Sequence, residues 1–373
     1  MKVSVGGLSY VSSIMFVGMS LAIQIKQLAR EQGFDLAGVA GVDGHAELEH
    51  FAPWIERGRH GEMGYLAARN DQGALKRQSL QNAAPWARSV IVCAVNYNAD
   101  APYSTHAGTT REGWIARYAW SAADYHDVLL PRLRKLEAAI ALLAPNEGIP
   151  FRSWCYVDTG PVVERVFAKY AGIGWIGKNT CILNQKMGSW LFLGVILTNL
   201  ALEVDLPAAD RCGSCTRCLD ACPTHAFVGP HELDATRCIS YLTIEKHGEI
   251  PEDLRAQMGR HVFGCDICQD VCPWNRKAPV GSLLELQPVT ERVNPALDWL
   301  AALDAEKYRE MTRKSPIRRA KWSGLKRNVA IAIGNSGDAS LLESARRLAD
   351  DPDPTVAEHG RWAVERLRRT EQK

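Results

Sequence analysis

The hydrophobic pattern in the first half of the chain predicts strands that alternate with helices. Residues 89–97 and 189–200 are largely apolar and rich in β-branched or aromatic side chains, which is typical of buried strands. Residues 151–158 have a similar composition, and a further short strand is expected after Gly33. These strands are expected to form the sheet of the predicted first domain.

Between these strands, apolar residues recur at helical spacing. Residues 20–32 form one such stretch, and the glycine that follows is expected to be its C-cap. A second helix is predicted within residues 125–148, with Pro131 inside it. A third is predicted to begin at Pro161, because proline is favoured in the first turn of a helix. This alternation predicts an α/β domain.

The pattern changes from residue 295 onward, where no strand is predicted. Three helix-length blocks follow, separated by Gly, Asp and Pro, at residues 325–335, 339–351 and 354–369. This succession of helices and short breaks resembles one helical pair of the HEAT type. We therefore expect four parts, namely an N-terminal extension (1–21), the α/β domain (22–205), a cysteine-rich domain (206–285) and a helical region (286–373).

Composition supports an ordinary folded protein. The 373 residues predict two or three domains, and 46% apolar with 23% charged residues excludes disorder, collagen-like repetition and a disulfide miniprotein. The net charge is only +2, so a polyanionic partner would have to bind a local basic patch. The apolar opening segment imitates a secretory signal, but Gly and Ser interrupt it. We favour a true start near Met15 or Met19 and no membrane contact over a targeting segment.

The chain contains eleven cysteines, and eight of them lie within residues 212–272. An odd number in tight C-x2-C groups favours metal ligation in a reducing compartment over a disulfide framework. Residues 212–223 read C-x2-C-x2-C-x3-C-P, the run by which bacterial ferredoxins hold 4Fe–4S clusters. Residues 265–273 repeat the ending of this run without its first cysteine, which Cys238 can supply.

In ferredoxin runs the fourth cysteine binds the other cluster, so the eight cysteines divide into two ligand sets. The first set is Cys212, Cys215, Cys218 and Cys272, and the second is Cys222, Cys238, Cys265 and Cys268. Zinc would leave the two C-x3-C-P endings unexplained. The remaining cysteines have apolar surroundings and are expected to be buried without a role, namely Cys93, Cys155 and Cys181. Because such clusters only transfer single electrons, another centre must accept them.

Four segments of the chain resemble the epoxyqueuosine reductase family. They are DTGPVVERVFAKYAGIGWIGKNT (158–180), GSWLFLGVILT (188–198), RCISYLTIE (237–245) and HVFGCDICQDVCPWN (261–275). The resemblance implies an α/β cobalamin-binding domain, a ferredoxin-like domain with two 4Fe–4S clusters and a C-terminal α-helical HEAT-like repeat that binds tRNA. It also implies that a ferredoxin- or flavodoxin-like donor supplies electrons, and that the enzyme is cytoplasmic and monomeric.

By this resemblance, Asp158 donates a proton during the reduction of epoxyqueuosine to queuosine at the wobble position of tRNA. Removing the epoxide oxygen as water requires two electrons and two protons, and a carboxylic acid can deliver one of the protons. The alternative is that Asp158 caps the helix that begins near Pro161. Glu164 and Arg165 are expected to form a surface or interdomain pair, and His126 is expected to line the pocket or serve a structural role.

The resemblance also assigns contacts to cobalamin. Cobalamin is expected to be surrounded by Arg77, Asp158 and polar residues of the family segments. These polar residues are Lys178, Asn179, Thr180, Ser189, Ser240 and Asp266. Taken singly, several of these are also ordinary turn residues.

Residues 307–328 hold nine Lys or Arg and a single acid, whereas the whole chain is nearly balanced. Such a patch suits tRNA phosphates, with Trp322 available for stacking, although a solvated basic helix is the common alternative. The expected tRNA contacts are Arg318, Arg319, Lys321, Lys326 and Arg327. Two other functions remain open: a two-cluster electron-transfer module for a partner enzyme, and a dehalogenase-like cobalamin enzyme that acts on a small molecule.

Overall fold

The computed structural model describes residues 19–103, 108–144 and 148–371. Met15 and most of the N-terminal extension lie outside these residues, whereas Met19, the other expected start, is the first residue of the described part. Among the helices of the described part, none combines the length and the apolar character needed to cross a membrane.

A four-stranded sheet forms the centre of the first domain. Its strands are β1 (Leu36–Ala40), β2 (Ser89–Asn96), β4 (Ser153–Tyr156) and β7 (Leu191–Thr198), in the order β1–β2–β7–β4. All four predicted strands are therefore present. Every pair is antiparallel, whereas alternating strands and helices are typical of a parallel sheet. The predicted α/β layering of helix and sheet is thus present, and the antiparallel direction of the strands is a feature that the sequence analysis did not address.

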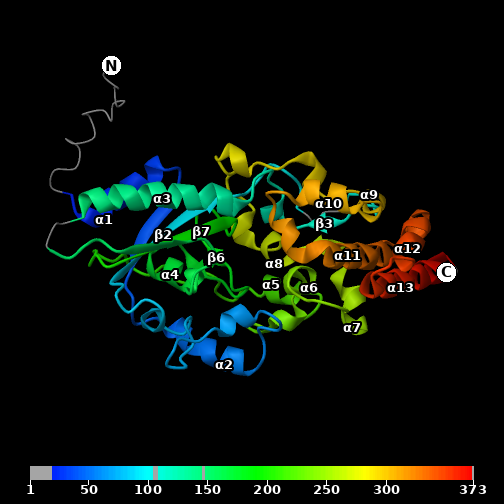
Figure 1. The fold of residues 1–373 in the computed structure, drawn as a ribbon, viewed down its shortest axis with the longest axis horizontal. Coiled ribbons are helices and arrows are strands. Elements are labelled where there is room, and N and C mark those ends of the chain that lie inside the picture. The colour runs from blue at the N-terminus through cyan, green and yellow to red at the C-terminus, as the bar shows by residue number, and fades with distance from the viewer. Residues whose placement is uncertain (1–18, 104–107, 145–147, 372–373) are drawn as a thin grey trace, which may run out of the picture.

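Helices cover both faces of this sheet (Figure 1). One face carries α1 (Leu21–Glu31) and α3 (Tyr125–Leu143), and the other carries α4 (Glu164–Tyr170). Two glycines allow the close approach. A Cβ on Gly194 would lie 2.7 Å from the Leu133 side chain of α3, and a Cβ on Gly38 would lie 2.0 Å from the carbonyl oxygen of Ala171 after α4.

The boundaries of α3 and α4 test two helix predictions. Helix α3 is confirmed, with Pro131 inside it. Helix α4 begins three residues later than predicted, at Glu164, so Pro161 is not in its first turn. Residues 158–163 instead form a loop between β4 and α4, and this loop carries Asp158.

The cysteine-rich segment lies between the sheet and the C-terminal helices (Figure 1). A short helix follows each C-x2-C group, and a β-hairpin and two more helices separate them. These elements are α5 (Arg217–Asp220), β8 (Phe227–Gly229), β9 (Glu232–Leu233), α6 (Ile239–Ile244), α7 (Glu252–Arg255) and α8 (Ile267–Asp270). Strand β10 (His261–Phe263) pairs in parallel with β3 (Trp114–Ile115), which ties this segment to the first domain.

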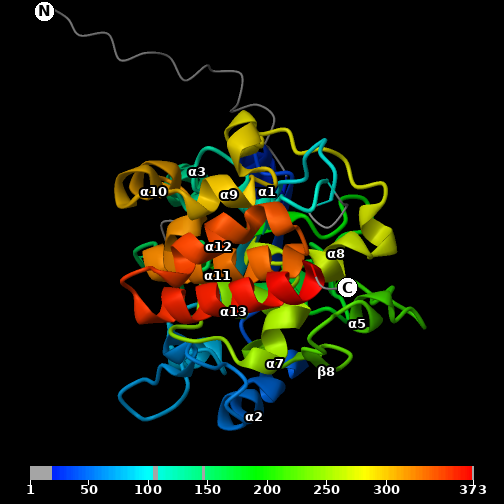
Figure 2. The ribbon, with the colours of Figure 1, turned by 90° about the vertical axis from the view of Figure 1, so that its right-hand side faces the viewer.

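The C-terminal region is helical in its described part, as predicted. Its helices are α9 (Leu297–Ala301), α10 (Ala305–Thr312), α11 (Lys321–Ser336), α12 (Leu342–Ala349) and α13 (Pro354–Glu371). Figure 2 shows α12 and α13 beside α11. Their hydrophobic core includes Ile115, Trp120, Val262 and Phe263, which come from earlier segments. The helical region therefore shares its core with the rest of the protein.

Candidate active site and cluster ligands

The first predicted ligand set comes together around α5 and the end of α8. Cys212 and Cys215 lie on the loop that leads into α5, Cys218 lies within α5, and Cys272 follows α8. Burial, together with the charges on Cys272, Cys212 and Cys215, raises the pKa of the Cys218 thiol to about 11. These interactions require the four thiols to be close neighbours.

The second predicted set is also assembled from separate elements. Burial raises the pKa of Cys265, and charges on Cys238 and Cys222 add to this effect. Cys268 interacts in the same way with Cys265 and Cys238. No group of three His, Cys, Asp or Glu side chains in the described part of the chain could hold a single metal ion.

Cys181 departs from the sequence prediction. It was expected to be a buried cysteine without a role, like Cys93 and Cys155, which are indeed buried within the sheet. Instead its thiol lies beside the thiol of Cys268 of the second ligand set, close enough for each to shift the pKa of the other. Its sequence context gives no sign of this contact, since only the fold brings the start of β6 (Ile182–Leu183) to the cysteine-rich segment.

Asp158 lies at the end of β4 with a left-handed backbone, at φ 61°. Such a conformation is uncommon outside glycine, and it concentrates at functional sites. The Tyr125 hydroxyl donates a hydrogen bond to Oδ2 of Asp158, and the side chain of Asp158 is 49% exposed. The N-cap of α4 is Val163, so Asp158 does not cap that helix. The alternative structural role of Asp158 is therefore wrong.

Tyr125 and His126 begin α3 and face the Asp158 carboxylate. Burial and the charge of Asp158 raise the pKa of Tyr125, so its hydroxyl remains a donor. His126 has its Nδ1 2.7 Å from Oδ1 of Asp124 and its Nε2 3.8 Å from Oδ2 of Asp158. Burial lowers the pKa of His126, but the hydrogen bond to Asp124 outweighs this and raises it overall. His126 therefore has a structural partner in Asp124 and also lies beside the Asp158 carboxylate.

The predicted pair of Glu164 and Arg165 is replaced by a different arrangement. The Arg165 guanidinium donates to the carbonyl oxygen of Thr180, at 3.0 Å. Glu164 has a buried Oε1 with no hydrogen-bond partner among the described residues. The shielded, unpartnered Oε1 of Glu164 was not predicted from the sequence.

Several predicted cobalamin contacts join the first domain to the cysteine-rich segment. Lys178 donates to the carbonyl oxygens of Gly213 and Cys215, at 2.7 and 3.0 Å. Asn179 donates to the carbonyl oxygen of Cys268, at 3.2 Å. The buried Ser189 hydroxyl accepts hydrogen bonds from Gln269 and Asn275. Asp266 accepts one from the backbone N–H of Arg117, at 2.6 Å.

Arg77 connects the Asp158 loop to the basic segment. Its guanidinium donates to the carbonyl oxygens of Gly160 and Tyr65, at 2.7 and 2.6 Å. The guanidinium groups of Arg77 and Arg319 lie 5.7 and 5.6 Å from the centre of the Tyr65 ring. Arg319 also donates to the Tyr65 hydroxyl and pairs with Glu245. Sequence reasoning did not identify Tyr65, which lies more than 250 positions from Arg319.

The five predicted tRNA contacts fall into two groups. Arg318, Arg319 and Lys321 are exposed. Arg327 is only 1% exposed, and its guanidinium donates to the carbonyl oxygens of Leu242, Lys246 and Gly248. Lys326 forms an ion pair with Asp351, and the side chains of both residues are largely buried. The structure therefore gives Arg327 and Lys326 packing roles, because neither presents its charge to a partner.

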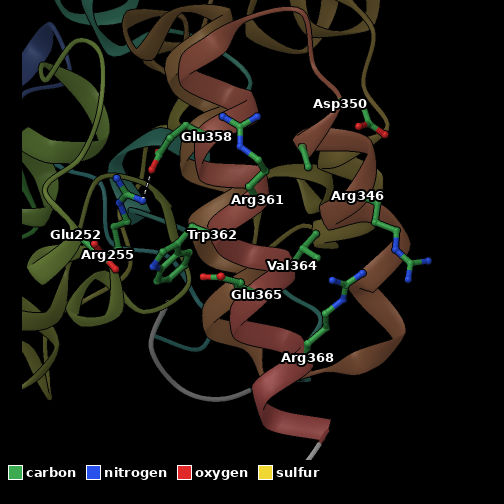
Figure 3. Close-up of a pocket in the computed structure, with 11 residues that line it drawn as sticks. Glu252, Arg255, Arg346, Asp350, Glu358, Arg361, Trp362, Val364, Glu365 and Arg368 are labelled. Atoms are coloured by element: carbon green, nitrogen blue, oxygen red, sulfur yellow. Dashed lines mark hydrogen bonds and ion pairs between the residues drawn. The ribbon is translucent and has the colours of Figure 1, made fainter.

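A cavity of about 560 Å³ lies between α7 and the helices α12 and α13 (Figure 3). Basic and acidic side chains both line it, and Arg255 pairs with Glu358 beside it. None of the predicted site residues lines this cavity. It is therefore separate from the site around Asp158.

Comparison with known proteins identifies the family. An epoxyqueuosine reductase of Xanthomonas campestris is 39% identical over 92% of this chain and 95% of its own length. One from Pseudomonas aeruginosa is 41% identical over 93% and 94% of the two chains. The chain belongs to the epoxyqueuosine reductase family. The family model described as epoxyqueuosine reductase QueG matches residues 77–159, which run from Arg77 to just past Asp158.

A second family model, described as a 4Fe–4S double cluster binding domain, matches residues 211–275. Solved epoxyqueuosine reductases share the fold as well. The enzyme from Streptococcus thermophilus is 29% identical, with a TM-score of 0.81 over 93% of this chain and 90% of its own. A structure with an epoxyqueuosine-modified tRNA-Tyr stem loop is 31% identical, with a TM-score of 0.77 over 95% and 94% of the chains.

Proposed function

We infer that this chain reduces epoxyqueuosine to queuosine in tRNA, at the wobble position. The observation that best supports this function is a chain of contacts from the exposed Arg319 through Tyr65 and Arg77 to the Asp158 loop. A tRNA whose phosphates meet the basic segment would therefore place a nearby base at Asp158. Arg318 and Lys321 extend the same exposed segment.

The chain carries two 4Fe–4S clusters, since the double-cluster model spans all eight cysteines of the predicted ligand sets. We propose Cys212, Cys215, Cys218 and Cys272 for one cluster, and Cys222, Cys238, Cys265 and Cys268 for the other. Within each set the thiols interact electrostatically, as ligands of a common group would.

Cobalamin is the second cofactor of this proposal, and when bound it passes electrons from the clusters to the epoxide. The contact between the first domain and the cysteine-rich segment suits a polar cofactor. Beside Ser189, the buried indole N–H of Trp190 has no partner among the described residues. Among the expected contacts, Ser240 would contact the group directly. Residues whose polar atoms already bond to protein would hold the surrounding loops in place, namely Arg77, Lys178, Asn179, Thr180, Ser189 and Asp266.

Asp158 is the proposed proton donor to the departing oxygen. The Tyr125 hydroxyl holds its carboxyl group in one orientation, and the half-exposed side chain can reach a bound base. A solved Bacillus subtilis epoxyqueuosine reductase, 30% identical with a TM-score of 0.77 over 95% of this chain and 94% of its own, has its catalytic aspartate loop swung out of the active site. The loop at 158–163 would move in the same way.

The decisive experiment reconstitutes the protein anaerobically with iron, sulfide and cobalamin and analyses modified tRNA by nucleoside mass measurement. Asp158→Asn should retain the corrin and bind tRNA, while single-turnover product formation falls by about 10²-fold or more. Near-normal turnover would mean that another acid protonates the oxygen. Failure of the wild type to retain the corrin after desalting would favour the electron-transfer module, and failure to bind tRNA would favour a small-molecule substrate.

A further inference from the structure

The exposed charges around the first ligand set are mostly positive. They lie on three segments, residues 184–188, 206–220 and 273–280, and we call the surface that these segments form the cluster face. Its exposed cations are Lys186, Arg211, Arg217, Arg276 and Lys277, and its exposed acids are Asp210 and Asp220. Among the residues that the structure describes, none forms a hydrogen bond or an ion pair with the side chain of any of the five cations. All five are therefore available to a partner.

Contacts around two tryptophans bring the three segments together. The rings of Trp175 and Trp274 pack edge to face with their centres 5.0 Å apart, and the Trp175 indole N–H lies 3.4 Å from the Cys212 sulfur. Gly188 brings the turn at 184–188 to the same place, because a Cβ on it would lie 3.2 Å from the carbonyl oxygen of Trp274. The three segments are therefore neighbours around one set of cluster ligands.

The two acids of the cluster face are engaged by the loop that carries the cysteines. Asp210 accepts a hydrogen bond from the backbone N–H of Cys212 at 2.7 Å, and Asp220 accepts one from the Thr216 hydroxyl at 2.8 Å. Five free cations thus outnumber two acids that already have partners. The cluster face therefore attracts a negatively charged partner.

An exposed apolar side chain lies on the same segment. Leu206 is 87% exposed. Two residues later, the Ala208 N–H donates to the carbonyl oxygen of Lys169, and Ala208 packs with Trp175 and Cys212. The backbone beside Leu206 is thus held in place while its side chain meets solvent. Apolar contacts within a polar, charged rim are typical of protein–protein interfaces.

A protein partner fits this surface better than tRNA. Figure 2 shows α5 and α8, which belong to the cysteine-rich segment, on one side of the molecule and α10, at the start of the basic segment, on the opposite side. The contacts that lead to the Asp158 loop begin at Arg319 in the basic segment. The tRNA of the proposed function is therefore bound elsewhere, whereas the cluster face surrounds ligands of an electron-transfer group.

We propose that the cluster face is the docking site of the electron donor, a small acidic protein that carries a one-electron centre. This inference rests on the function proposed above and names the partner of the same electron path. Each encounter oxidises the donor by one electron and reduces the neighbouring cluster by one, so two encounters supply the two electrons that each epoxide consumes. Attraction between the five cations and the acids of the donor speeds the encounter, and salt weakens it.

The test measures conversion of modified tRNA with two reductants, a reduced acidic flavodoxin and a small low-potential reductant. The variant combines Lys186→Glu and Lys277→Glu, which reverse two charges and leave every cluster ligand in place. At low ionic strength and limiting flavodoxin, its turnover should fall about 10-fold below that of the wild type, and added salt should narrow this difference. Iron content and turnover with the small reductant should equal those of the wild type.

The matched control is Lys135→Glu. Lys135 is an exposed lysine of α3 without an ion pair among the described residues, and α3 covers the face of the sheet opposite α4. Its reversal changes the net charge by the same amount per site but should leave turnover with both reductants unchanged. An equal loss of flavodoxin-driven turnover in this control would mean that overall charge, and not the cluster face, attracts the donor, and would overturn the inference.

A second measurement locates the donor on the wild-type protein. Carbodiimide cross-linking joins lysines directly to the carboxylates of a docked flavodoxin, and mass analysis of the peptides should identify Lys186 and Lys277. These cross-links decide the question if the double variant also loses iron. Cross-links confined to the basic segment, or unchanged flavodoxin-driven turnover in the double variant, would overturn the inference.

Weaker tRNA binding by the double variant would also overturn it, because the cluster face would then belong to RNA. None of these results affects the proposed function. That function fails only if wild-type protein supplied with the small reductant does not convert the modified tRNA.

Discussion

The two cluster ligand sets differ in their surroundings. Around the first set, the loop residues Gly213, Ser214 and Arg217 are exposed, and α5 buries none of its residues. Around the second set, Gly264 and Asp266 are buried on either side of Cys265. The first set thus belongs to the outside of the protein and the second to its interior. We call them the outer and the inner ligand sets.

A series of aromatic side chains links the inner set to Asp158. Phe263, two residues before Cys265, lies 5.9 Å from Tyr118 between ring centres, and Tyr118 lies 6.2 Å from Tyr125, which bonds to Asp158. The outer set instead contacts Trp175, whose indole N–H lies 3.4 Å from the Cys212 sulfur. This difference implies that electrons enter at the outer cluster and leave from the inner one.

The largest effect should come from Cys265→Ser, which removes an inner ligand. Iron content should fall by about one cluster of the two, because the outer ligands remain. Reduction of modified tRNA should be abolished with a protein donor and equally with a small low-potential reductant. Iron analysis with electron paramagnetic resonance and the nucleoside assay measure both outcomes. Retained activity would mean that the inner cluster does not lie on the electron path.

Cys215→Ser, which removes an outer ligand, should have a more selective effect. Iron content should again fall by one cluster, but a small reductant can still reach the inner cluster. Turnover driven by a ferredoxin- or flavodoxin-like protein should be lost, while turnover with the small reductant should largely persist. Equal losses with both reductants would remove the distinction between the outer and inner sets.

The same contrast explains what the sequence could predict. The cysteine spacing specified a segment whose ligands come from fixed positions in a motif, so the double-cluster domain was predictable from local sequence. All four sheet strands and the helix around Pro131 were predictable for the same reason. The Asp158 pocket depends on side chains brought together by the fold, such as Tyr65 with Arg77. Cys181 and Glu164 were therefore missed, because no local pattern reports a contact across domains.

Within the basic segment, local sequence likewise does not distinguish exposed from buried arginines. The test of this distinction has a smaller expected effect. Arg318→Ala should weaken tRNA binding and reduce the slope of log affinity against log salt by about 1, since an exposed arginine meets phosphate. Arg327→Met should leave that slope unchanged. It should instead lower the free energy of unfolding by about 1–3 kcal/mol, because buried carbonyl oxygens lose their donor. Salt titrations and denaturant unfolding separate the two, and a changed slope in Arg327→Met would contradict its packing role.

The smallest effect concerns the inner cluster alone. Cys181 is not a proposed ligand, so Cys181→Ala should keep the full iron content. Its thiol lies beside Cys268, and once Cys268 binds a cluster as a thiolate, the Cys181 S–H can donate to it; hydrogen bonds to cluster sulfurs raise the reduction potential by stabilising the more negative reduced state. Potentiometric titration followed by electron paramagnetic resonance should therefore show a lower potential for the inner cluster and an unchanged outer one. Cys93→Ala, in the centre of the sheet, should shift neither potential. A shift confined to the outer cluster would place Cys181 beside the wrong ligand set and reverse the assignment of inner and outer.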